Sequence, residues 1–152
     1  MGSPIGQNMR LNMAIPDVVI NYWAVLVTGL VGFFIGMIWY SPAVFGNLWM
    51  NWSGLNPNKA KSMKKKSMAG FLVLALIGSL LMAFVLAHFV QYLTVTSFND
   101  VLRLAFLVWL GFTAPITVGM VLWQGKPWKL WFLMESHNLL VFIIMTWILS
   151  SW

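Results

Sequence analysis

Residues 69–93 read AGFLVLALIGSLLMAFVLAHFVQYL and contain no charged side chain. An α-helix rises about 1.5 Å per residue, so about 20 apolar residues cross a hydrocarbon layer about 30 Å thick. Because that layer contains no water, the backbone must satisfy its own hydrogen bonds, and a helix does so. The stretch therefore predicts a transmembrane helix.

Three further stretches have the same character. Residues 20–40 and 104–124 carry no charge, and residues 130–149 carry a single acid, Glu135. We therefore expect an all-α integral membrane protein, folded as an antiparallel four-helix transmembrane bundle. The expected spans are about 20–40, 69–93, 104–124 and 130–149, in a single domain over residues 20–150. Residues 1–19 form a polar N-terminal segment that is partly tag-like.

The composition supports this class of protein. Hydrophobic residues make up 61% of the chain and charged residues 8%, whereas a soluble domain averages about 25% charged residues. The net charge is +6, but five of the nine basic residues lie in one run between the first two spans: Lys59, Lys61, Lys64, Lys65 and Lys66. A basic run beside apolar segments indicates contact with membrane lipids, so we expect no nucleic-acid partner.

The loops predict an orientation. The five-lysine run lies between the first and second spans, and Lys126 and Lys129 lie between the third and fourth. Since Lys and Arg accumulate in cytoplasmic loops, both termini are expected outside the cytoplasm.

The loop after the first span is predicted to hold a short interfacial helix. Ser41 offers an N-cap and Pro42 suits the first helical position. Aromatic and apolar residues then recur at helical spacing, and Gly54 can end the helix. A plain Trp-rich loop is the alternative.

Small residues recur along the spans, for example Gly32 and Gly36 in the first and Ala83 and Ala87 in the second. Such residues allow close approach of helices in lipid, within one chain or between chains. Pro115, in the middle of the third span, predicts a kink that serves as a helix hinge or is static.

A candidate polar site is expected near the inner leaflet, formed by Glu135, His137, Asn138, Tyr40 and Gln124. An acid inside a membrane helix is a functional-site hypothesis by default, although Glu135 near a helix end can instead pair with Lys126 or Lys129. Positions i and i+2 of a helix point about 200° apart, so Glu135 and His137 face different sides, whereas Asn138 can lie beside Glu135.

No metal site or cofactor is expected. His88 lies near the other end of its span, about 18 Å from the depth of His137, so the two histidines do not share a metal. A haem or chlorophyll held by His88 alone would rest on one residue. The chain has no cysteine and no motif of a hydrolase elbow, phosphate loop or dinucleotide site, so we expect no enzyme.

Two segments resemble a known family. The first is NYWAVL at residues 21–26 leading to WYSPAVFG at residues 39–46, and the second is LWQGKPW at residues 122–128 running into SHNL at residues 136–139. They resemble the small bacterial membrane proteins of domain-of-unknown-function family 1761, over most of residues 20–150. The resemblance implies four spans in the bacterial inner membrane and no particular activity.

Three functions remain open. The first is a structural or accessory membrane protein that forms a homo-oligomer or joins other membrane subunits. The second is a small oligomeric transporter or channel that uses the polar site. The third is a lipid- or pigment-binding membrane protein.

Overall fold

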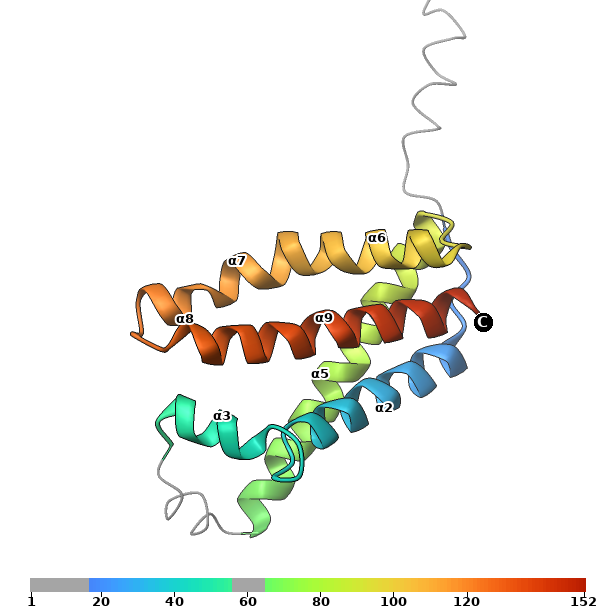
Figure 1. The fold of residues 1–152 in the computed structure, drawn as a ribbon. Helices are drawn as coiled ribbons and strands as arrows, with labels where there is room; N and C mark the ends of the chain where they lie inside the picture. The colour runs from blue at the N-terminus through green and yellow to red at the C-terminus, as the bar shows by residue number, and fades with distance from the viewer. Residues whose placement is uncertain (1–16, 56–64) are drawn as a thin grey trace, which may run out of the picture.

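A computed structural model describes residues 17–55 and 65–152, and these ranges contain helices and no strand. The helices, seen in Figure 1, are α2 (Tyr22–Trp39), α3 (Gly46–Ser53), α5 (Lys65–Tyr92), α6 (Phe98–Val108), η1 (Trp109–Thr113), α7 (Ala114–Thr117), α8 (Gly119–Leu122) and α9 (Trp128–Ser150). Most of the expected N-terminal segment and Lys59, Lys61 and Lys64 of the basic run lie outside the described residues.

Four helical segments are long and apolar enough to cross a membrane: Tyr22–Trp39, Met68–Tyr92, Phe98–Leu122 and Trp128–Ser150. The prediction of an all-helical protein with four candidate spans is thus confirmed. The third segment begins at Phe98, ahead of the uncharged residues 104–124 on which the prediction was based. Ser97 caps it, because its hydroxyl accepts a hydrogen bond from the backbone N–H of Asp100 at 3.2 Å. Asp100 and Arg103 pair at 3.7 Å on its exposed first turns, so their charges do not prevent the helix.

Helix α2 packs chiefly on α5 and also on α9, whereas α6 packs on α9. Figure 1 shows α6, α7 and α8 alongside α9, with α5 crossing them obliquely. Helices α2 and α5 approach closely at Gly29, where the Ser79 hydroxyl donates to the Gly29 carbonyl at 2.7 Å. A Cβ at Gly29 would lie 3.0 Å from the Leu80 Cα, so only glycine permits this approach.

The small residues divide between the inside and the outside of the bundle. Gly29 and Gly32 face other helices of the same chain, and Ala83 and Ala87 are buried in the core. Ala75 and Gly111 are exposed, and a Cβ at Gly111 would meet nothing within 4 Å. The first group therefore serves the fold of the monomer, and the second leaves an open surface.

The expected helix after the first span is present but begins later than predicted. The Ser41 hydroxyl donates to the Ile38 carbonyl at 2.7 Å and so closes α2 instead of capping α3. The chain then reverses, and the Gly46 N–H donates to the Ser41 carbonyl at 2.8 Å. A Cβ at Gly46 would overlap the backbone of Tyr40 and Ser41, which explains the glycine that ends the WYSPAVFG motif. Gly54 ends α3 with a φ of 73°, as predicted.

Helix α3 is tied to the loop before α9. Lys126 donates through Nζ to the backbone carbonyl of Ser53, the last residue of α3, at 2.7 Å. The last carbonyls of a helix lack intrahelical partners and carry partial negative charge, so a lysine there is stabilising.

Replacing Gly29 by alanine is expected to destabilise the protein by about 1–3 kcal/mol, because the added methyl group meets the α5 backbone. Gly70→Ala is the matched control, since a Cβ at Gly70 on α5 meets nothing within 4 Å. Thermal unfolding of both variants in detergent measures the difference. Equal melting temperatures would contradict the close approach.

Replacing Lys126 by methionine is expected to loosen α3, because the Ser53 carbonyl loses its charged donor. Hydrogen exchange of the α3 amides should accelerate relative to wild type. Lys129→Met, which changes an exposed lysine in the first turn of α9, should leave the exchange unchanged. Identical exchange in both variants would show that Lys126 does not hold α3.

Candidate functional site

Glu135 lies inside the protein and is only 2% exposed. It is about 10 Å along α9 from Trp128, at 1.5 Å per residue. Its Oε2 accepts from the indole N–H of Trp109 at 2.8 Å, and its Oε1 accepts from the Asn138 Nδ2 at 2.9 Å. A buried carboxyl group is costly unless hydrogen-bonded, and these two donors replace water.

The alternative in which Glu135 pairs with a loop lysine is not observed. Lys126 instead donates to the Ser53 carbonyl, and Lys129 is exposed. The carboxyl group therefore belongs to the helix–helix contact and not to the surface of the bundle.

An irregular turn places Trp109. Residues Trp109–Thr113 form one π-helical turn, closed by the Ala114 N–H donating to the Trp109 carbonyl. Pro115 lies two residues after the end of this turn and has no N–H for the regular α-helical ladder. Single π turns are frequent at functional sites, and this one carries the indole that reaches Glu135. The hinge motion suggested for Pro115 stays a prediction.

A second side-chain bridge follows this turn. The Thr117 hydroxyl donates to the Thr113 carbonyl at 3.0 Å and accepts from the Trp131 indole N–H at 3.1 Å. Two tryptophans, Trp109 and Trp131, thus mark the contact of the third helical segment with α9.

His137 faces another side of α9 from Glu135, as the helical spacing predicts. Its ring centroid lies 5.1 Å from that of Tyr40 and 5.7 Å from that of Trp39, both at the end of α2. Its Nδ1 lies 3.3 Å from the Asn138 Oδ1. Asn138 therefore links His137 to Glu135 within one helix.

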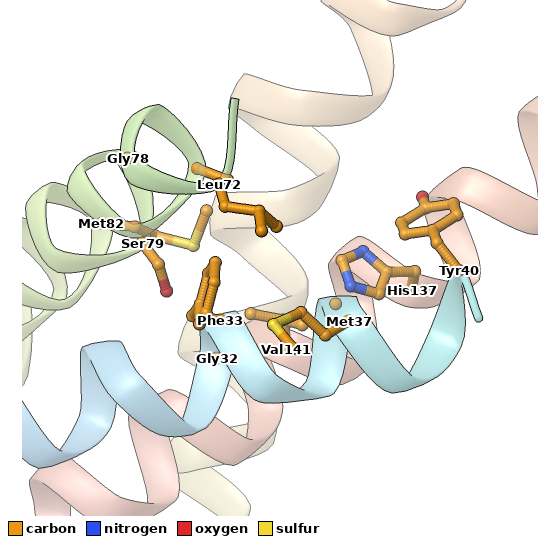
Figure 2. A pocket seen from close by; sticks show the side chains of 12 residues that line it. Gly32, Phe33, Met37, Tyr40, Leu72, Gly78, Ser79, Met82, His137 and Val141 are labelled. Carbon is orange, nitrogen blue, oxygen red and sulfur yellow. The ribbon is translucent and has the colours of Figure 1, made fainter. Parts of the chain in front are cut away.

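A pocket of about 440 Å³ lies between α2, α5 and α9. Ligand pockets in proteins commonly measure about 300–1,000 Å³ and are mostly apolar with a few polar groups. Figure 2 shows His137 and Tyr40 at one end and Gly32, Ser79 and Met82 at the other. The walls between them are apolar and include Phe33, Met37, Leu72 and Val141.

Tyr40 stays neutral at this site. Burial raises the pKa of Tyr40 to about 12, and the negative charge of Glu135 adds to the shift. The phenol is therefore a hydrogen-bonding group near the pocket and not a charge.

The structure brings together four of the residues expected at the site: Glu135, Asn138, His137 and Tyr40. Gln124 is exposed at the end of the third segment and makes no described hydrogen bond to them. Sequence reasoning missed Trp109, although a tryptophan deep in an apolar run needs a partner for its indole N–H. This need for an acceptor was the feature of the sequence that could have identified Trp109.

Within residues 17–55 and 65–152, no group of three or more His, Asp or Glu side chains is placed to hold a metal ion. His88 lies elsewhere, with its Nδ1 2.8 Å from the Phe84 carbonyl. The arrangement at Glu135 and His137 is thus a hydrogen-bonded cluster beside an apolar pocket.

Four apolar helices, each long enough to cross a membrane, indicate a multi-pass helical membrane protein. The chain belongs to the family described as protein of unknown function (DUF1761), whose profile matches residues 23–150. No curated protein and no solved structure matches the chain. The resemblance noted in the sequence is confirmed.

Replacing Trp109 by phenylalanine is expected to destabilise the protein by about 1–3 kcal/mol, because one buried oxygen of Glu135 loses its donor. Trp123→Phe is the control, since Trp123 is 86% exposed, and it should change stability by less than about 0.5 kcal/mol. Thermal unfolding in detergent checks both. Equal melting temperatures would remove the structural role of the Trp109–Glu135 hydrogen bond.

Proposed function

We propose that this chain binds a lipid-soluble small molecule in the pocket between α2, α5 and α9. The observation that carries the proposal is an apolar pocket of about 440 Å³ with a buried histidine nitrogen at one end. The pocket is an open groove, since its lining includes the exposed residues Met37, Leu72 and Gly78. Its apolar walls favour a hydrocarbon occupant over water.

The proposal includes a membrane arrangement. The four helices form an antiparallel bundle in the bacterial inner membrane, with both termini outside the cytoplasm and α3 in the inner interface. Aromatic residues lie near both ends of the helical bundle, as expected of side chains that favour the level of the lipid headgroups. One group is Tyr22, Trp23, Tyr92, Trp147 and Trp152, and the other is Trp39, Trp49, Trp52, Trp123 and Trp128. Lys126 and Lys129 lie at the second end and support its cytoplasmic placement.

A second candidate function is a structural or accessory role, in which the chain associates with itself or with another membrane subunit. Helix α5 favours it, because only 11% of its membrane-length window is buried. The exposed face of α5 includes Ala75 and Gly78, and small residues permit close helix contacts in lipid. A transporter or channel has less support, because Glu135 does not line the pocket.

Replacing Gly78 by leucine is expected to fill the pocket without disturbing the fold. Gly78 lines the pocket, and a Cβ there would meet nothing within 4 Å. Gly70→Leu is the matched control on the same helix, since Gly70 is equally open and does not line the pocket. Native mass spectrometry of protein extracted gently from its membrane should find a small molecule on wild type and Gly70→Leu but not on Gly78→Leu.

Two results of that experiment would contradict the proposal. Retention of the molecule by Gly78→Leu would place it elsewhere, and wild-type protein without any molecule would remove the binding function. A complex with other polypeptides in fixed ratio would favour the accessory role instead.

The orientation is tested by single cysteines, because the chain has none of its own. An impermeant maleimide applied to intact cells should label Ser151→Cys and should label Gln124→Cys only after the cells are broken. The opposite pattern would invert the proposed orientation. Labelling of both positions from one side would contradict the proposal that α9 crosses the membrane.

A further inference from the structure

We propose that the groove between α6 and α9 binds a phospholipid whose head group carries both a phosphate and a primary ammonium. The phosphate would accept hydrogen bonds from Arg103, the ammonium would donate to Asp100, and an acyl chain would lie in the groove. This site is separate from the pocket between α2, α5 and α9, so the inference goes beyond the proposed function and does not rest on it.

Arg103 lies where the third helical segment enters the hydrocarbon layer. Residues 104–124, which follow it, carry no charge and extend about 30 Å at 1.5 Å per residue, the thickness of that layer. An arginine at this boundary keeps its charged end at the level of the lipid headgroups while its stem covers apolar surface. The guanidinium group is therefore at the depth of the lipid phosphates.

The guanidinium group of Arg103 has hydrogen-bond donors to offer. The side chain is 77% exposed, and its Nη1 lies 3.7 Å from the Oδ1 of Asp100. That distance is longer than a hydrogen bond between a guanidinium and a carboxylate, and no other acid among the described residues pairs with Arg103. Arginine presents five N–H donors in a planar fork that matches the oxygens of a phosphate.

Asp100 determines which head group fits beside this arginine. Its Oδ2 accepts from the Ser97 hydroxyl at 2.6 Å, whereas its Oδ1 has the more distant Arg103 as its partner. A purely anionic head group would place a like charge beside the carboxylate, which is unfavourable. A phosphate next to a primary ammonium offers the opposite charge to each residue, and the ammonium supplies N–H donors to Oδ1. Phosphatidylethanolamine has this chemistry.

The groove continues from Arg103 into the hydrocarbon layer. It measures about 360 Å³, and its other lining residues are apolar: Leu102, Phe106, Leu139 and Ile143. One turn beyond Phe106, the Trp109 indole donates to Glu135 at 2.8 Å and so joins the two helices below the groove. Apolar burial gains little free energy in lipid, so the contacts of the head group should decide the affinity.

The test compares three lipids with identical acyl chains. Phosphatidylethanolamine has both charges, phosphatidylglycerol has the phosphate alone, and diacylglycerol has neither. The purified full-length protein, freed of lipid in detergent, is titrated with each, and native mass spectrometry counts the lipid that is bound. Wild type should bind phosphatidylethanolamine about tenfold or more tightly than diacylglycerol, the effect expected of a charge-assisted hydrogen bond. Phosphatidylglycerol should lie between them.

Variants locate the site. Arg103→Gln should bind phosphatidylethanolamine no more tightly than diacylglycerol, and Asp100→Asn should bind phosphatidylethanolamine and phosphatidylglycerol equally. Both side chains lie on the exposed first turns of α6, so these variants should fold. Lys129→Gln changes an exposed lysine at the start of α9 and should behave as wild type. Gly78→Leu, which fills the pocket between α2, α5 and α9, should keep the preference.

Each departure from this pattern would overturn the inference. Equal binding of the three lipids by wild type, or a preference that survives in Arg103→Gln, would remove Arg103 as the phosphate site. A preference for phosphatidylethanolamine over phosphatidylglycerol that survives in Asp100→Asn would remove the ammonium contact. Loss of the preference in Gly78→Leu would place the lipid in the other pocket, which would overturn this site and support the proposed function.

Discussion

The carboxyl group of Glu135 must find its hydrogen-bond donors inside the protein, because apolar helices surround it and water does not reach it. One donor is the indole of Trp109, on the neighbouring helical segment, and the other is the amide of Asn138. The first ties that segment to α9. The second orients Asn138, whose remaining oxygen faces His137. A single acid thus determines the arrangement of three side chains on two helices.

The irregular third segment carries one of the donors that Glu135 requires. A regular helix would continue its hydrogen-bond ladder through Pro115, which has no N–H. The π turn at Trp109–Thr113 accommodates the break, and the indole that meets Glu135 lies at the start of this turn. The proline that disturbs the backbone therefore lies six residues after the tryptophan that satisfies the buried acid.

The pocket depends on how α5 crosses its neighbours. Helices α2 and α5 touch at Gly29, where a serine hydroxyl joins them. The first turns of α5 lie apart from those of α9 (Figure 1), so the space near His137 stays open. Because α5 crosses obliquely, much of its surface also remains free for lipid or for another helix. One crossing geometry thus accounts for both the pocket and the exposed face of α5.

The sequence by itself determined the number of apolar helices, the helix end at Gly54 and the pairing of Asn138 with Glu135, because each follows from local spacing, charge or glycine chemistry. It misplaced the starts of α3 and of the third segment, since the Ser41 hydroxyl closes α2 and the Ser97 side chain caps ahead of two charged residues. Only the tertiary structure decided the partner of Trp109, the exclusion of Gln124 from the cluster and the pocket beside His137. These features join residues on separate helices, and hydrophobic periodicity does not record how helices rotate and cross once packed.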